Sequence, residues 1–166
     1  MALKSDRHEF QTDISFFMNE TATRGGVASL STGGSGAAMD QGAALATYSA
    51  SASGQTPVGV LLNDMVNLDL TRQHINWHKD EVQKGGKVTL LRKGWVVTNM
   101  LEGSTTSLAG KPAYPAHSGN ISQTNIVADN DQVPIIGRFL SNVNQDGYAK
   151  VEVNLPVNAI MASGTA

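Results

Sequence analysis

The chain has 166 residues, 40% of them apolar and 5% aromatic, so one compact domain with additional arms must build its core from Val, Ile, Leu and Ala. The formal net charge of -2 gives no basic field for a phosphate backbone, and the lack of cysteine excludes disulfides, thiol nucleophiles and cysteine-ligated zinc. We therefore expect no nucleic-acid partner. No run of about 18 apolar residues occurs, so we also expect no membrane partner.

The first segment, residues 1–24, is polar apart from an apolar stretch over residues 10–18. Phe10, Ile14 and Phe17 are spaced as on one face of a short helix. Alternatively, the segment is an extended N-terminal arm whose phenylalanines insert into a neighbouring molecule, or these side chains cover the domain's own core. We single out four apolar residues here as candidate partner contacts: Phe10, Ile14, Phe16 and Phe17.

The second segment, residues 25–54, is rich in Gly, Ala and Ser. Such a composition loses much backbone entropy on ordering and buries little apolar surface in return. Leu45, Thr47 and Ser49 alternate with their neighbours, so one strand is possible there. We expect the rest to be a loop that becomes ordered through contact with another surface.

Residues 55–156 contain most of the strand signals. A Gly-Gln-Thr-Pro turn precedes an apolar run over residues 58–62, which predicts a buried strand. Alternation or short apolar runs predict further strands over 66–70, 88–91, 95–98 and 113–114, with a turn over 92–94.

The clearest pattern is a hairpin near the C-terminus. A strand over 135–140 is followed by a turn containing Asp146-Gly147, a pair typical of hairpin turns. Residues 149–154 then alternate, which predicts that Ala149, Val151 and Val153 point inward while Lys150, Glu152 and Asn154 point outward. Pro156 would end this strand, and residues 157–166 would form a C-terminal tail.

Short strands separated by Gly- and Pro-containing turns indicate an all-β fold, either a small β-barrel or a β-sandwich. We expect the N-terminal arm and the Gly/Ala/Ser-rich loop region to extend from it. The predicted division is therefore an arm over 1–24, a loop with the first strand over 25–54, a β domain over 55–156 and a tail over 157–166.

The most suggestive metal-binding pattern is a pair of histidines, His74 and His78. Two residues at i and i+4 share a helix face, and they would also share a face on a strand. The alternative is an exposed polar segment in which the histidines and Trp77 lie at an interface, so Trp77 joins the candidate partner contacts. We expect no metal, because the general base of the H-E-x-x-H pattern is missing and a match of two ligands is weak. We also expect no cofactor.

No other pattern predicts catalysis. The chain has no G-x-S-x-G nucleophile elbow, and its Gly-rich stretch at 33–36 lacks the Lys-Ser/Thr of a phosphate loop. Glu102 and Glu152 could in principle be the paired carboxylates of a glycosidase, but both are predicted at outward or turn positions. We therefore expect the protein not to be an enzyme.

Three segments resemble the capsid decoration proteins, also called cement or head-stabilisation proteins, of marine and cyanobacterial tailed phages. They are residues 55–64 continuing to 67–73, residues 84–94, and residues 136–140 followed by 146–153. Their specificity comes from the order of these strand and turn patterns over about residues 55–155, and residues 1–54 contribute little to it. The longer Gly/Ala/Ser-rich first third departs from the smallest members of the family.

The resemblance implies a virion structural protein on the outer surface of the phage head, synthesised in the host cytoplasm. Such a protein would bind the major capsid protein, join neighbouring capsid subunits and stabilise the expanded shell, often as a homotrimer. The alternatives are another virion component, such as a head fibre, a knob or a tail protein, or a β module that binds host-surface polysaccharide.

Overall fold

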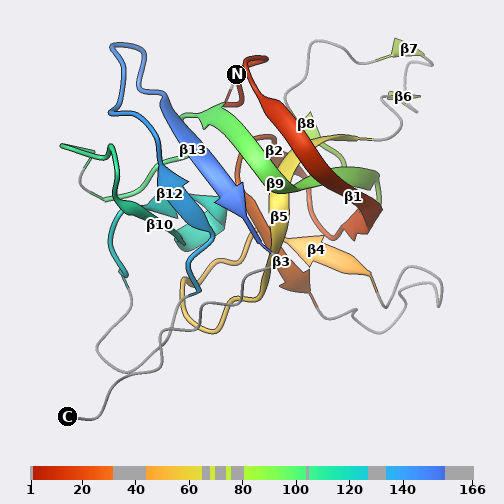
Figure 1. Ribbon diagram of the computed structural model, residues 1–166. Helices are drawn as coiled ribbons and strands as arrows, with labels where there is room; N and C mark the ends of the chain where they lie inside the picture. The colour runs from red at the N-terminus through yellow and green to blue at the C-terminus, as the bar shows by residue number, and fades with distance from the viewer. Residues whose placement is uncertain are drawn as a thin grey trace.

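The computed structural model describes residues 2–31, 44–64, 68–69, 74–75, 81–103, 105–126 and 134–155. Half of the chain is in strands and a single 3-10 turn, η1 (His117–Gly119), is the helical element of the described residues, so the predicted all-β class is confirmed (Figure 1). The strands, in chain order, are β1 (His8–Met18), β2 (Ala22–Thr23), β3 (Val27–Ser31), β4 (Leu45–Thr47), β5 (Pro57–Asp64), β6 (Leu68–Asp69), β7 (His74–Ile75), β8 (Glu81–Val82), β9 (Lys87–Thr98), β10 (Pro112–Pro115), β11 (Ile121–Ser122), β12 (Gly137–Phe139) and β13 (Ala149–Asn154).

Nine of these strands form one mixed sheet in the order β1-β4-β3-β5-β9-β13-β12-β10-β11. A further pairing joins β1 to β9, so the first five strands close into a ring. The ring contains one parallel pair, between β1 and β4, and its other pairs are antiparallel. Strand β9 therefore belongs both to the ring and to the open sheet that continues through β13.

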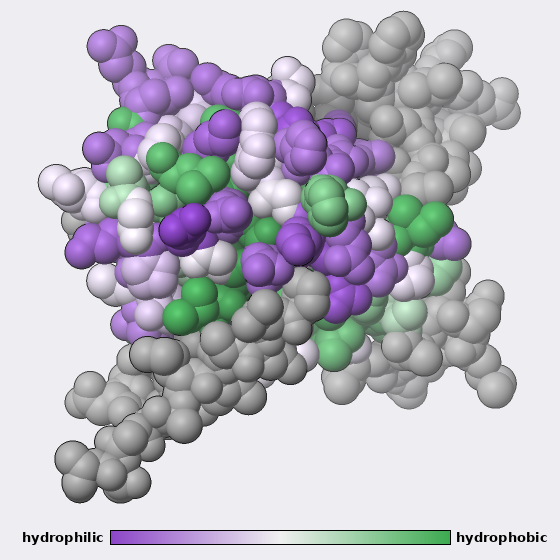
Figure 2. All heavy atoms as spheres, in the orientation of Figure 1, coloured by the Kyte–Doolittle hydropathy of each residue, from purple (hydrophilic) through white to green (hydrophobic). Residues whose placement is uncertain are grey.

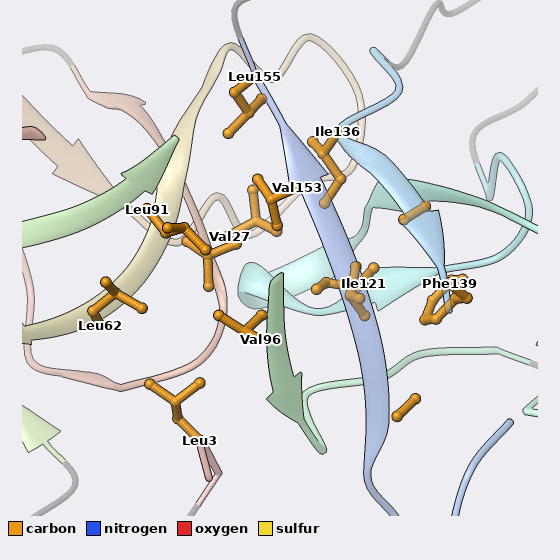
Figure 3. Close-up of a cluster of buried hydrophobic side chains, with 14 of the residues drawn as sticks. Leu3, Val27, Leu62, Leu91, Val96, Ile121, Ile136, Phe139, Val153 and Leu155 are labelled. Carbon is orange, nitrogen blue, oxygen red and sulfur yellow. The ribbon is translucent and has the colours of Figure 1, made fainter. Parts of the chain in front are cut away.

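Two clusters of buried side chains lie on the two sides of the ring wall. The inner cluster receives side chains from all five ring strands and consists of Met18, Ala22, Ala28, Ala46, Val58, Leu61, Val82, Val88 and Leu90. The outer cluster joins the ring to the open sheet and includes Val27, Val60, Leu62, Leu91, Val96, Ile121, Ile136, Phe139, Val151 and Val153 (Figure 3). Because Leu61 and Leu62 face different clusters and are both fully buried, the apolar run at 58–62 has no solvent-facing side.

The C-terminal hairpin is confirmed. In β13, Ala149, Val151 and Val153 are buried, while the residues between them are partly or fully exposed. The backbone N–H of Gly147 donates to the carbonyl of Asn144 at 3.0 Å, and Gly147 has a φ of +83°, which glycine adopts without steric cost. The first strand is shorter than expected and comprises β12.

Two sequence-based expectations differ from the structure. The helical alternative for Phe10, Ile14 and Phe17 is wrong, because residues 8–18 are the long strand β1, which pairs with β9. The predicted turn at 92–94 is also wrong, because β9 runs unbroken through it. A bulge there sets two residues of β9, Leu91 and Lys93, opposite adjacent residues of β1, and Gly94 has a φ of +144°.

The predicted arm and loop segments contribute directly to the ring. Strand β1 lies within residues 1–24, and β3 and β4 lie within residues 25–54. The strand expected around Leu45 is confirmed as β4. The predicted C-terminal tail lies outside the described residues.

Candidate functional site

The apolar residues proposed as partner contacts are distributed along β1. Phe10 is 73% exposed and Ile14 is 46% exposed, whereas Phe16 and Phe17 are half-buried. Phe16 packs against the inner cluster, so it stabilises the ring itself. Trp77 lies outside the described residues. Two of the five candidates therefore present large apolar surface to solvent.

Phe10 also lines an open hollow of about 220 Å³ formed by residues of β1, β9 and β13. The hollow is lined by His8, Phe10, Lys93, Gly94, Trp95, Glu152, Val153 and Asn154. The strand register brings residues of the three strands together, because Trp95 of β9 is opposite His8 of β1 on one side and opposite Glu152 of β13 on the other. Residues directly opposite each other in antiparallel strands share a face of the sheet.

Gly94 allows β1 to approach β9 at the floor of this hollow. A Cβ atom at this position would overlap the carbonyl oxygen of His8, and the φ of +144° is strained for a residue with a side chain. This close contact places His8 directly opposite Trp95. The rings of His8 and Trp95 are nearly parallel, at 19°, with centroids 6.4 Å apart.

Lysine side chains lie over the aromatic rings of this face. The ammonium of Lys150 is 3.3 Å from the centroid of the Trp95 ring, and that of Lys93 is 5.3 Å from the centroid of the Phe10 ring. Farther along β9, Lys87 lies 5.9 Å from the centroid of Phe17. Such cation–π contacts contribute about 0.5–1 kcal/mol each at exposed sites.

The carboxylate of Glu152 already has a partner. The Nε of Arg138 donates a hydrogen bond to it at 3.0 Å, across the β12–β13 pair. Within the described ranges, no carboxylate forms an ion pair with Lys93 or Lys150. The hollow and its rim therefore have a positive excess, although the whole chain has a formal net charge of -2.

A second polar contact holds the middle of β1 against β9. Burial alone would raise the pKa of Asp13, but hydrogen bonds from the side chain and backbone of Ser15 and from Arg92 outweigh it, so the pKa is lowered. Arg92 is the residue at the bulge of β9, and its Nη1 lies 3.4 Å from the carboxylate of Asp13. The ionised form of Asp13 is thus the form that the fold favours.

The two histidines considered as metal ligands, His74 and His78, are not tested by the structure. His78 and the side chain of His74 fall outside the described residues. Among the side chains that are described, no group of three or more His, Asp or Glu is arranged to hold a metal ion. This pair therefore remains an untested sequence pattern.

The two glutamates considered for glycoside hydrolysis have different partners. Glu102 accepts hydrogen bonds from the backbone N–H of His117 at 2.9 Å and forms a 2.7 Å contact with its Nδ1. Glu152 pairs with Arg138 and lines the hollow, and Glu102 is not among the lining residues. Among the described residues that line the hollow, no two carboxylates oppose each other as they do in a glycosidase centre.

Sequence reasoning missed His8, Lys93 and Trp95 as parts of one site. The structure leaves Trp95 partly exposed, and its side chain lines the hollow. The alternation in β13 did indicate that Lys150 and Glu152 point outward. What it could not supply is the register of β1 on β9, since that pairing joins strands about 80 residues apart in sequence and includes irregular steps.

The surface view shows no single large apolar area on the face in view, where hydrophilic and hydrophobic residues are interspersed (Figure 2). No helix among the described residues is long and apolar enough to cross a membrane. No protein-family model matches the chain, and no curated protein gives a significant match.

Proposed function

We propose that this protein is a non-catalytic structural component of a tailed-phage virion that binds the outer surface of the head and joins neighbouring major capsid subunits. The resemblance of residues 55–155 to decoration proteins supports this function. The observation that contributes most from the structure is the exposure of Phe10 and Ile14 on β1, at irregular steps that are flanked on both sides by residues paired with β9. An apolar side chain on a paired strand loses little entropy when a partner covers it.

The mechanism follows from selective binding. A protein that binds the expanded shell and not its other states stabilises that shell by mass action. If it acts as a homotrimer at a junction of capsid subunits, three modest contacts add through a high effective concentration. A broad exposed surface serves this purpose better than a deep pocket, and the open hollow beside β1 is compatible with such a surface.

The first test is binding to expanded heads of the phage that encodes the chain, after removal of the resident protein. The variant Phe10→Ser combined with Ile14→Ser should bind about tenfold or more weakly, since each exposed apolar contact removed costs about 1 kcal/mol or more. Leu30→Ser combined with Leu140→Ser is the matched control, because these residues are 50% and 41% exposed.

If the wild-type protein does not bind expanded heads, the proposed function is refuted. Equal losses in both double variants would show that the contact is not made by β1. Image reconstruction of the virion separates the head from the alternatives within the particle, because a fibre, knob or tail component would give density elsewhere.

A second candidate is a β module that binds polysaccharide. It is favoured by one observation, the presence of the His8, Phe10 and Trp95 rings beside the polar groups of Glu152 and Asn154 in a single hollow. Rings of this kind stack on sugar faces while amides and carboxylates bind hydroxyl groups. The test is binding of the purified protein, without phage heads, to a panel of neutral host-surface polysaccharides. Binding that is abolished by Trp95→Ala would support this candidate over a capsid partner.

A further inference from the structure

We propose that the face formed by Phe10, Lys93, Trp95 and Lys150 docks an acidic segment of a partner protein. This inference names the chemistry of the capsid contact and rests on the proposed function. It depends on three features of the described structure: the uncompensated lysines, their fixed positions and the exposed Phe10 ring beside them.

The charge of the face is the first feature. Lys93 and Lys150 contact aromatic rings and form no ion pair with a described carboxylate. The carboxylate of Glu152, which lines the same hollow, is already bound by Arg138 at 3.0 Å. An incoming Asp or Glu would therefore meet two available ammonium groups and no unpaired carboxylate of the hollow.

The fixed positions of the lysines are the second feature. The Lys150 ammonium lies 3.3 Å from the Trp95 ring centroid, and the Lys93 ammonium lies 5.3 Å from that of Phe10. A lysine held against a flat ring has lost part of its rotational freedom before a partner arrives, so less entropy is lost on binding. A neutral sugar would have to displace these cations to stack on the same ring faces. The arrangement consequently favours an anionic partner.

The exposed ring of Phe10 is the third feature. Phe10 is 73% exposed, and its ring centroid lies 5.3 Å from the ammonium of Lys93. An exposed apolar ring next to two ammonium groups suits a protein segment that has both carboxylates and an apolar side chain better than a single small anion.

The test compares two charge-reversed proteins on an immobilised acidic probe, poly-L-glutamate, and then on expanded heads. Lys93→Glu combined with Lys150→Glu should weaken binding to both about tenfold at low ionic strength, and the difference should shrink as salt screens the charges. Lys84→Glu combined with Lys111→Glu is the matched control, because both lysines are exposed and do not line the hollow. It has the same net charge and should behave much more like the wild type.

The outcomes separate the inference from the proposed function. Equal weakening by the two double variants on poly-L-glutamate would overturn the inference, since net charge alone would then explain binding. Retention on poly-L-glutamate with no binding to heads would overturn the capsid function and support the acidic docking face. Tighter binding of the wild type to polygalacturonate, an anionic polysaccharide, than to poly-L-glutamate would overturn the assignment to a protein segment.

Discussion

Replacement of Gly94 by alanine tests whether β1 is firmly fixed to β9. A new Cβ atom would overlap the carbonyl oxygen of His8, and the φ of +144° would become strained. Overpacking against rigid backbone costs about 1–3 kcal/mol, and a positive φ costs a residue with a Cβ about 1–2 kcal/mol. We therefore expect Gly94→Ala to lower the free energy of unfolding by about 2–5 kcal/mol.

The control is Gly110→Ala, because Gly110 also has a positive φ, +82°, but a Cβ atom there would have no neighbour within 4 Å. It should lose only the conformational part, about 1–2 kcal/mol. Urea denaturation at pH 7 measures both, and a thermal scan should place the midpoint of Gly94→Ala roughly 5–10 °C below that of the control. Equal losses in the two variants would refute a tight β1–β9 contact at this position.

Three further predictions concern the ring and its polar contacts. Tyr48→Phe removes the hydroxyl that accepts the backbone N–H of Gly26 at 3.0 Å, so we expect a loss of about 1–3 kcal/mol in urea unfolding. Burial raises the pKa of Tyr48, so wild-type stability should fall as pH rises above about 10, and this fall should be smaller in Tyr48→Phe. The pKa of Asp13 is lowered by hydrogen bonds from Ser15 and Arg92, so its ionised form contributes stability that is present above about pH 4 and lost as pH falls further. When unfolding is measured between pH 2 and 7, Asp13→Asn should reduce this loss of stability at low pH. Deletion of residues 1–18 should open the ring and abolish the cooperative unfolding transition, whereas a sharp transition in the truncated protein would show that the rest folds without β1.

Local patterns predicted the elements whose environment is set by nearby sequence. The buried run at 58–62 became β5, and the alternation after the Asp146-Gly147 turn became β13 with its expected inward face. In both cases the hydrophobic pattern matched the period of the strand, and the turn residues matched the backbone that they adopt.

The features that sequence did not predict are set by long-range pairing. The residues around Gly94 looked like a turn, but they lie inside β9 because β1 passes close enough to exclude a side chain there. The spacing of Phe10, Ile14 and Phe17 matched a helix, but β1 has bulges that disturb the simple alternation of a strand. A period-based argument cannot detect such irregular steps, since they depend on the partner strand.

Strand β1 has two roles that call for different perturbations. Its inward residues close the ring, with Met18 fully buried in the inner cluster, and its exposed residues Phe10 and Ile14 are the partner contacts that we propose. Removal of the whole segment would confound the two roles, because loss of binding would follow from loss of folding. Substitutions at exposed positions leave the β1–β9 hydrogen bonds in place, so a variant that keeps the wild-type unfolding midpoint but loses binding assigns the partner surface to β1 directly. If no such variant exists among the exposed residues of β1, the strand serves the fold alone and the partner surface lies elsewhere.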